Sequence, residues 1–420
     1  MPVNSSFSLQ PSAFSLYFPV ISLEEAQDRI LAAIEPLPAE EIPVQDALGR
    51  YLAAPIHSPV CLPPADNSAM DGYAVRAADL AAATAENPVA LRLSGETRAG
   101  NVFAGGVEAG ACVRIFTGAV LPRGADAVVM QEEVKQAADQ PAKIIVSQKV
   151  KLWENVRLRG EDVRENALLA GAGEELTAQR LSLLAAAGVA AAPVGRRPEV
   201  GLLATGDELR EAGRALPPGM IYESNRTGLA ALAREAGAIP KLYPPVADDL
   251  VLTKQALRTA FQECDVVVTS GGVSVGATDW VRQAFAEIGG QLDFWTVAIR
   301  PGRPFAFGRH GGKLLFGLPG NPVSALVSFF LLARPALLRL QGARDLRPPA
   351  SWGTLAEPLG NRGERRHFAR VVLDAGGQVR SAGSQASHIL SSMARANGLV
   401  DVPPGTTWPA GTPVAVLRWN

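Results

Sequence analysis

Acidic and glycine residues follow the predicted strands in the second half of the chain, at positions where they could bind a phosphorylated ligand. The clearest case is DVVVTSGGVSVGATDW, residues 265–280. Its apolar run Val266–Val268 is typical of a strand buried on both faces. Gly271 and Gly272 then free the backbone, so that successive N–H groups can converge on an anion. Asp279, at the start of a predicted helix, could hold a cation or a water beside that anion.

Two other predicted strands run into acidic pairs. The strand over 200–204 leads into TGDE, residues 205–208, and the strand over 239–246 leads into Asp248–Asp249. Strands that alternate with helices indicate a doubly wound parallel sheet, whose carboxyl ends share one edge and form the usual ligand crevice. Carboxylates crowded on one edge repel one another unless a cation or cationic side chains offset them.

Cationic side chains downstream could supply that compensation. Arg300 and Arg303 are spaced around Pro301, and guanidinium forks suit oxyanions such as phosphate or a tetrahedral metal oxoanion. A further strand leads into PGNPVS, residues 319–324, where Asn321 is the predicted N-cap and a proline opens the helix. A helix N-terminus with a serine in its first turn is a ready anion site.

The first half of the chain carries two further candidate segments. Residues 66–71, DNSAMD, place two carboxylates, an amide and a hydroxyl in a turn-forming sequence, and Thr117 puts a hydroxyl at a predicted strand end. RLRGEDVR, residues 157–164, holds Glu161 and Asp162 among arginines that would keep them ionised. By spacing alone, an Asx-turn cluster and a solvated turn are equally ordinary interpretations. The same holds for a tight turn at the glycines, a plain cap at Asn321 and a solvated arginine pair.

Length and composition restrict the class of protein. A chain of 420 residues exceeds one ordinary core, so about two to four domains are expected. A net charge of −1 argues against nucleic-acid binding and against a polybasic membrane anchor. Three scattered cysteines and four histidines argue against zinc and a disulfide framework, and favour a reducing compartment. The longest apolar run, Leu326–Ala333, is too short to span a bilayer, so we expect a cytoplasmic protein.

Changes in composition and hydrophobic pattern along the chain suggest the order of its elements. The N-terminal 19 residues are expected to be flexible, and a short-stranded C-terminal segment over 348–420 suggests a β-barrel or sandwich. His388 in that segment lacks the companions of a hydrolase triad and is interpreted as a packing or capping residue. The other predicted elements are helices over 22–34, 44–48, 177–188, 225–236 and 250–263, and a β-rich module over 89–150.

Seven motifs in this order resemble those of the molybdopterin molybdenumtransferase family (MoeA; the gephyrin E domain is similar). They are DNSAMDGY at 66–73, TG at 117–118, RGEDVR at 159–164, ATGDEL at 204–209, SGGVSVGATD at 270–279, RPGRPFAFG at 300–308 and GLPGNPVSAL at 317–326. The resemblance covers the chain from about residue 20 onward. It implies an α/β multidomain fold of four regions. These are a discontinuous linker domain (20–60 and 155–194), an inserted β-rich module (61–154), a three-layer α/β pterin/nucleotide-binding domain with a mainly parallel sheet (195–343), and a C-terminal β-barrel (344–420).

The resemblance implies that the chain transfers molybdenum from molybdate onto adenylylated molybdopterin and releases AMP. A phosphoanhydride needs a divalent cation and positioned acids, and molybdate needs cationic and N–H donors. The implied catalytic residues are Asp279, Asp248, Glu208, Asp162, Asp66 and Thr117, with Mg²⁺ at Asp248, Asp279 and Glu208. The implied pterin or nucleotide site comprises Thr205, Gly206, Ser270, Gly271, Gly272, Pro319, Gly320, Asn321 and Pro322. The implied molybdate site comprises Arg300, Pro301, Ser324, Arg370, Ser387 and Arg303.

The family is a homodimer with its active site at the subunit interface, so Asp66 and Thr117 would reach in from the partner. A molybdopterin adenylyltransferase is the implied upstream partner. The chain departs from the family at Arg300 and Arg303, which are commonly lysines, and at Thr296, where another lysine often contacts the pterin phosphate. Two alternatives stay open: an adenylyltransferase that shares only the α/β domain, and a non-catalytic scaffold like gephyrin. Neither the choice between molybdate and tungstate nor the cation follows from the sequence.

Overall fold

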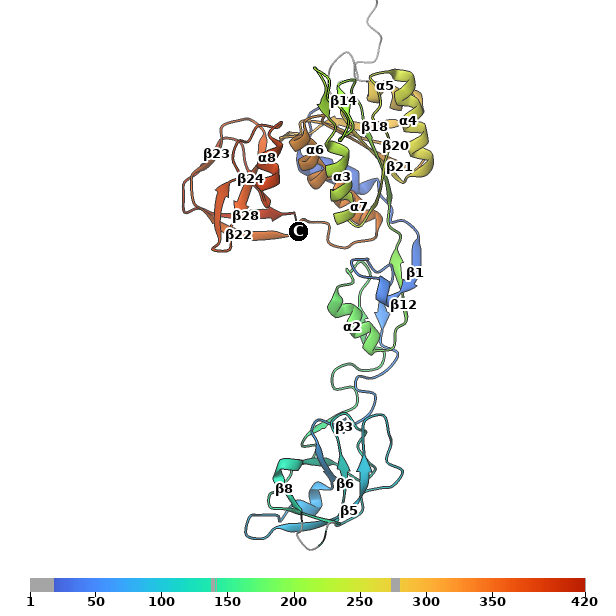
Figure 1. The fold of residues 1–420 in the computed structure, drawn as a ribbon, viewed down its shortest axis with the longest axis vertical. Coiled ribbons are helices and arrows are strands. Elements are labelled where there is room, and N and C mark those ends of the chain that lie inside the picture. Colours follow the sequence, from blue (N-terminus) through green and yellow to red (C-terminus); the bar gives the residue numbers. More distant parts are fainter. Residues whose placement is uncertain (1–18, 137–139, 141, 273–279, 420) are drawn as a thin grey trace, which may run out of the picture. The chain divides into compact units, whose positions relative to one another are not determined.

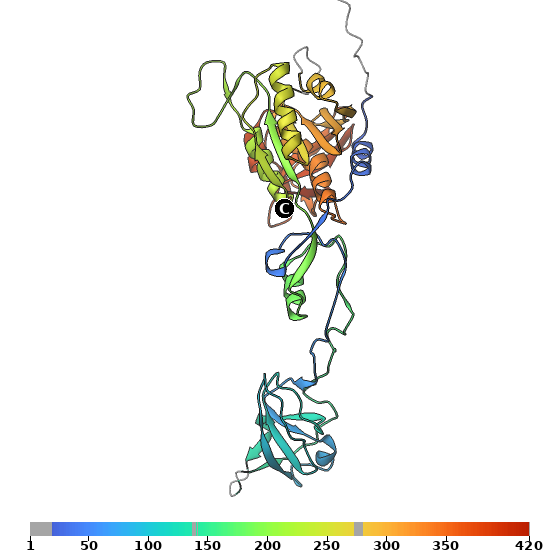
Figure 2. The same ribbon diagram turned by 90° about the vertical axis from the view of Figure 1, so that its right-hand side faces the viewer.

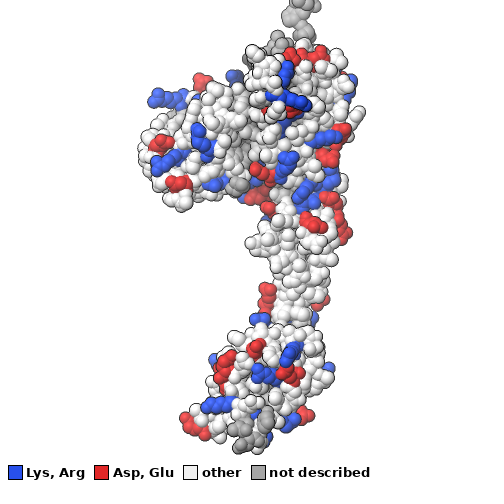
Figure 3. All heavy atoms as spheres, in the orientation of Figure 1, with Lys and Arg blue, Asp and Glu red and all other residues white. Residues whose placement is uncertain are grey.

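The computed structural model describes residues 19–136, 140, 142–272 and 280–419, which form two compact units (Figure 1). Unit 1 comprises Met1–Glu40 and Val194–Asn420, and unit 2 comprises Glu41–Pro193. Strands β1 (Ala39–Pro43) and β12 (Ala191–Gly195), which contain the two points where the chain changes units, pair with each other. Figure 3 shows acidic and basic side chains interspersed on the visible face of each unit. The division into four regions stays a prediction.

Unit 1 contains the predicted parallel sheet. Its six strands lie in the order β16-β13-β17-β21-β20-β18, and the first four are parallel. β20 is antiparallel to β21 and β18 is antiparallel to β20, so the sheet is mainly parallel, as predicted. β16 ends earlier than predicted, at Leu242, because Pro244 and Pro245 follow and lack ladder N–H donors. The strands are β16 (Ile239–Leu242), β13 (Glu199–Ala204), β17 (Val266–Ser270), β21 (Lys313–Leu318), β20 (Pro304–His310) and β18 (Gln291–Thr296).

Helices cover both faces of this sheet, which gives the three layers predicted for it (Figures 1 and 2). α4 (Leu250–Glu263) and α5 (Trp280–Glu287) cover one face, where Val267 packs among their apolar side chains. Val266 and Val268 point to the other face, as alternation along a strand requires. That face is covered by α1 (Leu23–Ala32), α3 (Asn225–Glu235), α6 (Pro322–Ser328), the π-helical segment η4 (Phe329–Ala333) and α7 (Arg334–Leu340).

The run from α6 through α7 forms one helical stretch, Pro322–Leu340, which is longer than the apolar run Leu326–Ala333. The stretch continues through Pro335. A proline N–H is missing there, and the preceding π-helical turn shifts the hydrogen-bond pattern. The 19 residues are long and apolar enough to cross a membrane by composition, but 83% of the apolar window is buried inside unit 1. The stretch is therefore a buried core helix that packs against one face of the sheet.

The C-terminal strands close into a barrel, which decides between the two predicted architectures. Five strands follow one another in the order β24-β25-β22-β28-β26, and β26 pairs back onto β24. β19 (Ile299–Arg300), from the α/β part of unit 1, adds to β24 in parallel. The barrel strands are β22 (Ala350–Leu355), β24 (Arg366–Leu373), β25 (Gln378–Ser381), β26 (Gly398–Val402) and β28 (Pro413–Arg418).

Unit 2 is built on a six-stranded sheet, as predicted for a β-rich module. Its order is β7-β4-β6-β5-β9-β8, and the DNSAMDGY segment leads into its strand β4 (Gly72–Val75). Thr177 caps α2 (Ala178–Ala186) by accepting the N–H of Arg180. The helix predicted near 44–48 is a single 3₁₀ turn, Val44–Asp46. The remaining sheet strands are β5 (Val89–Thr97), β6 (Ala111–Ile115), β7 (Ala127–Met130), β8 (Val134–Gln136) and β9 (Lys143–Val146).

Candidate functional site

A cavity of about 670 Å³ lies at the carboxyl ends of the parallel strands of unit 1. Its walls come from the ends of β13, β17 and β21, from the start of α3 and from the start of α6, as expected for a doubly wound sheet. All nine residues predicted to bind pterin or nucleotide line it: Thr205, Gly206, Ser270, Gly271, Gly272, Pro319, Gly320, Asn321 and Pro322. Glu208, Asp248 and His388 line it as well, so His388 faces this cavity.

The glycines after β17 let the chain turn into the cavity wall. Gly271 has φ +87° and Gly272 has φ +66°, which side-chain-bearing residues rarely adopt. A Cβ on Gly271 would lie 2.7 Å from the carbonyl oxygen of Thr205, and one on Gly272 would lie 2.4 Å from Val281. Both glycines are therefore required by backbone conformation and by close packing.

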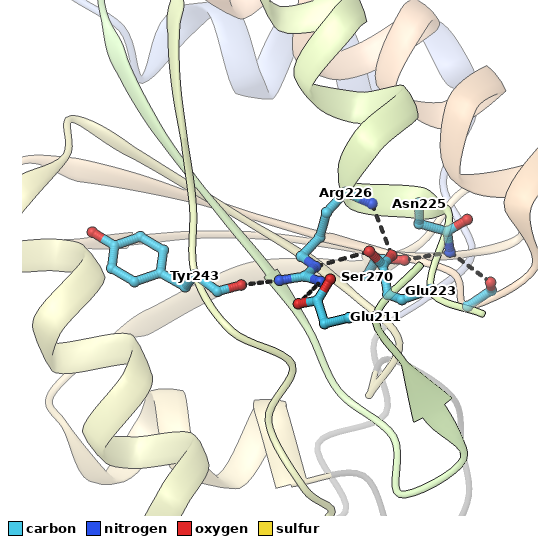
Figure 4. Close-up of polar contacts among 7 residues, drawn as sticks. Glu211, Glu223, Asn225, Arg226, Tyr243 and Ser270 are labelled. Atoms are coloured by element: carbon cyan, nitrogen blue, oxygen red, sulfur yellow. Dashed lines mark hydrogen bonds and ion pairs between the residues drawn. The ribbon is translucent and has the colours of Figure 1, made fainter. Parts of the chain in front are cut away.

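Asn225, at the start of α3, fastens the cavity wall and was not predicted as a site residue. Its side-chain amide donates to Ser270 Oγ over 2.7 Å and to the Gly320 carbonyl over 2.8 Å (Figure 4). It thus ties α3 to the ends of β17 and β21. Asn321, predicted as an N-cap, occupies the cap position of α6 but makes no side-chain cap bond, and it lines the cavity instead.

We expect Asn225→Ala to weaken ligand binding in the cavity by about tenfold and to lower the free energy of unfolding by about 1–2 kcal/mol, because two polar partners lose their donor. Nucleotide titration followed by fluorescence, together with thermal unfolding, would measure both effects. Asn225→Asp replaces the donating amide nitrogen by an acceptor oxygen, so the side chain can no longer donate to either partner. This variant should therefore behave like the alanine variant. Wild-type affinity in both variants would show that the bonds do not shape the cavity.

The acidic residues predicted at this edge do come together. The Asp248 N–H donates to Asp207 Oδ1 over 3.0 Å. Burial raises the pKa of the Asp248 carboxyl, and the negative charges of Asp207 and Glu208 raise it further. The ionised carboxylates therefore repel, and a cation would relieve that repulsion.

The predicted Mg²⁺ site is incomplete within the described residues. No group of three His, Cys, Asp or Glu side chains is placed there to hold a metal, and Asp279 lies outside the described ranges. Mg²⁺ is commonly held by one or two carboxylates together with substrate phosphates and waters. The repelling carboxylates of Asp248 and Glu208 fit that pattern, with the ligand supplying the remaining oxygens.

A group of arginines, which we call the arginine cluster, gathers where the α/β part of unit 1 meets the barrel. It consists of Arg300, Arg303, Arg365 and Arg370. Burial lowers the pKa of Arg365, as do the charges of Arg303 and Arg300, and burial and Arg300 likewise lower that of Arg370. None of the four forms an ion pair within the described part of the chain. Cations without a carboxylate partner attract anions, so this cluster is a candidate anion site.

Arg370 is the most buried member, with 1% of its surface exposed. Its guanidinium donates only to the carbonyls of Ser384 and Ala386, and its Nε has no partner. The same loop carries Ser387, whose carbonyl accepts the Val323 N–H over 3.3 Å and so lies at the start of α6. The structure thus joins Arg370 and Ser387, both predicted molybdate ligands.

The other predicted molybdate residues lie on the 300–303 turn and on α6. Gly302 has φ +107°, and a Cβ there would lie 2.3 Å from Ser328 Oγ, so the turn packs closely against α6. Ser324, one turn earlier on α6, is 5% exposed. The hydroxyl of Thr296 is buried without a partner among the described residues. The start of α6 therefore contacts both the cavity and the arginine cluster.

Known proteins match this arrangement along nearly the whole chain. Family models for the "MoeA N-terminal region (domain I and II)", a "Probable molybdopterin binding domain" and the "MoeA C-terminal region (domain IV)" match residues 21–188, 201–339 and 353–419. The molybdopterin molybdenumtransferase of Haemophilus influenzae is 37% identical over 390 residues, which cover 90% of this chain and 93% of that protein. The chain belongs to the MoeA family.

Further MoeA relatives agree. Molybdopterin molybdenumtransferase 2 of Mycobacterium tuberculosis is 39% identical over 368 residues, covering 86% of this chain and 90% of the relative. The crystal structure of the molybdopterin biosynthesis MoeA protein from Pyrococcus horikoshii superimposes with a TM-score of 0.83 at 32% identity, covering 96% of this chain and all of that one. The predicted multidomain α/β fold with a C-terminal barrel is confirmed.

In this MoeA chain, a buried ion network not predicted from the sequence supports one wall of the cavity. Arg226 on α3 donates to Glu223, which lines the cavity, through its backbone N–H over 2.9 Å and its Nε over 2.8 Å. It also donates to Glu211 over 2.8 Å and to the Tyr243 carbonyl (Figure 4). The side chains of Arg226 and Glu223 are 5% and 3% exposed, and that of Glu211 is 55% exposed. One guanidinium thus fixes three segments of the chain.

The remaining predicted catalytic residues, Asp66, Thr117 and Asp162, lie in unit 2. Asp66 accepts the Arg159 N–H over 2.7 Å, and the Asp162 N–H donates to the Leu62 carbonyl, so the DNSAMDGY and RGEDVR segments lie side by side. The N–H and hydroxyl of Thr117 both donate to Asp71 Oδ1 over 2.8 Å and thereby lower the pKa of Asp71.

The sequence left open whether Glu161 and Asp162 lie among arginines or in a solvated turn. Neither carboxylate forms an ion pair with an arginine in the described ranges, and Glu161 accepts the Leu158 N–H instead. In that segment Arg159 pairs with Glu165 instead, over 3.7 Å. The segment is a hydrogen-bonded turn, which alternation of charge in the sequence could not distinguish from an ion cluster.

Proposed function

We propose that this chain is a molybdopterin molybdenumtransferase that acts on adenylylated molybdopterin and molybdate and releases AMP. The observation that carries the proposal is the position of the start of α6. Pro319–Pro322 line the acidic cavity, while Val323 bonds to the loop that wraps Arg370 of the arginine cluster. A phosphorylated pterin in the cavity and an oxyanion at the arginines would therefore be neighbours. This proximity supports transfer between them.

The cavity residues would bind and orient the phosphates. Gly271 and Gly272 let the backbone approach phosphate oxygens closely, and the side chain of Asn321, which makes no cap bond, lines the same cavity. Asp248 and Glu208, with Asp279, would hold Mg²⁺, which neutralises charge on the phosphoanhydride when bound. Burial and the neighbouring charges of Asp207 and Glu208 raise the pKa of Asp248, which supports that assignment.

The arginine cluster would bind molybdate as a substrate. Arg300, Arg370, Ser324 and Ser387 supply cationic or hydroxyl donors, and no carboxylate of the described chain competes for these arginines. Arginine in place of the family's usual lysine at 300 and 303 offers planar, bidentate donors to tetrahedral oxygens. We also propose a cytoplasmic homodimer in which Asp66 and Thr117 of the partner subunit complete the site and Asp162 contributes to it. A molybdopterin adenylyltransferase would supply the adenylylated substrate.

The test is AMP release from adenylylated molybdopterin by the full chain, with Mg²⁺ and with or without molybdate. We expect release that depends on both Mg²⁺ and molybdate, and gel filtration should show a dimer. Adenylylation of free molybdopterin by ATP would support the adenylyltransferase alternative instead. A folded protein that binds the nucleotide without releasing AMP would favour the scaffold alternative and overturn the proposal.

A further inference from the structure

His367 is a buried imidazole without hydrogen-bond partners beside the arginine cluster. It lies on β24 and is 5% exposed, and neither Nδ1 nor Nε2 has a partner. In the parallel pairing of β19 with β24, His367 is opposite Arg300, so the two residues lie on the same face of the ladder. Unpartnered buried polar groups are costly and rare, and they often mark places where a ligand or an ion acts.

The charges around His367 keep its ring neutral. Burial, together with the positive charges of Arg300 and Arg370, lowers the pKa of His367 to about 4. The facing strand β26 carries Asp401, but both of its oxygens accept from Arg366. Glu24 on α1 is also engaged by Arg366. Arg366 therefore already neutralises the carboxylates of Asp401 and Glu24. The electrostatic potential at the imidazole ring is set mainly by the positive charges of Arg300 and Arg370.

We propose that binding of a doubly charged oxyanion at the arginine cluster is coupled to protonation of His367. The inference rests on the proposed function, since it deepens the assignment of the molybdate site. A dianion cancels the two charges that oppose protonation, and the ring then takes up a proton from solvent without any bond being broken in the anion. The arginines carry their charge at all times, whereas an imidazole can be neutral in the empty site and take up a proton when the anion binds.

This coupling has two consequences for selectivity. First, the empty site carries one positive charge fewer, which reduces repulsion among Arg300, Arg370 and His367 before the anion binds. Second, a dianion offsets the arginines more completely than a monoanion, so the protonated ring should favour molybdate over singly charged oxyanions. His367 would thus be a residue that determines specificity and acts through charge.

Calorimetric titration of the full-length protein with sodium molybdate, in two buffers of different ionisation enthalpy, counts the protons taken up. At about pH 6.5 we expect uptake of about half to one proton per molybdate bound, and affinity should weaken by up to about tenfold per pH unit above that. His367→Gln should bind molybdate with no proton uptake and with a flat pH profile. His310→Gln, which alters a histidine packed on Phe261 at the far strand β20, is the matched control and should behave as the wild type.

The outcomes separate this inference from the proposed function. Molybdate binding without proton uptake in the wild type, or with unchanged uptake in His367→Gln, would overturn the coupling and leave the oxyanion site standing. No molybdate binding by the wild type would overturn the oxyanion site itself. If His367→Gln does not fold, ring nitrogen spectra of the wild type decide the matter. The chain has four histidines, and the His367 signal must shift to the protonated form on molybdate addition.

Discussion

Replacing Asp248 by asparagine is expected to lower molybdate-dependent AMP release by at least about a hundredfold, because the substitution removes a charge that would hold the cation at the phosphoanhydride. The fold should remain intact. Asp248 is exposed at the cavity wall, and its side chain accepts no hydrogen bond within the described residues. The measurement is AMP release under saturating Mg²⁺ and molybdate.

The same substitution should leave stability unchanged or slightly raised. The pKa of Asp248 is raised in the folded state, so the folded protein holds the proton more tightly than the unfolded chain. Stability is therefore lost as pH rises from the unfolded pKa through the folded one, and at neutral pH the full cost is present. Since the side chain is exposed, screening limits the gain from asparagine to about 0.5 kcal/mol or less. Mg²⁺ should raise the Tm of the wild type more than that of the variant.

The neighbouring carboxylate provides a matched control. Asp249 is the N-cap of α4, and its side chain accepts the Leu252 N–H over 2.8 Å. Asp249→Ala should lower the free energy of unfolding by about 1 kcal/mol while AMP release stays near the wild-type rate. Equal activity of Asp248→Asn and wild type would remove Asp248 from the mechanism.

Arg226→Met is expected to lower the free energy of unfolding of unit 1 by about 3–5 kcal/mol, because Glu223 is left buried without its partner. Methionine retains most of the side-chain volume, so loss of packing contributes little. Fluorescence of Trp295, which is buried in β18 of unit 1, would follow the urea-induced transition. The cavity should also bind nucleotide more weakly, since Glu223 lines it.

A double variant separates the buried charge from the loss of the contact. Arg226→Met with Glu223→Leu removes both charges and should recover most of the lost stability, as replacement of whole buried ion pairs often does. Arg347→Met is the surface control, because Arg347 and Asp345 are 85% and 64% exposed. It should cost less than about 1 kcal/mol. A single variant as stable as the surface control would show that the network does not hold the wall.

Local chemistry in the sequence determined the elements and their ends. Leu250–Glu263 is helical as predicted, with an aspartate cap, and Val266–Val268 lies in a strand buried on both faces. The glycines at 271 and 272 mark a turn that only they can adopt. Each of these features depends on residues within a few positions of one another, so periodicity and capping rules can predict them. The motifs likewise identified the MoeA family, because each of the seven is a short local pattern and their order along the chain can be read directly from the sequence.

Only the tertiary structure decided which partners these residues have. Asn225 is the first residue of α3 and Asn321 is the cap of α6, but the side chain of Asn225 ties strand ends together, while that of Asn321 makes no cap bond and lines the cavity. Arg226 joins three segments, and Arg370 is buried against backbone carbonyls of a loop. Such contacts join residues far apart in the chain and depend on how helices and strands pack, which no local pattern encodes.

The chemistry of His367 shows the difference most clearly. The sequence places a histidine among arginines, a pattern as typical of a solvated surface as of a site. The pairing of β19 with β24 brings it opposite Arg300, and closure of the barrel buries it without partners. The fold class, the family and the residue types of the site follow from the sequence. Packing decided which charges meet in a low dielectric, and burial is what gives those charges their effect.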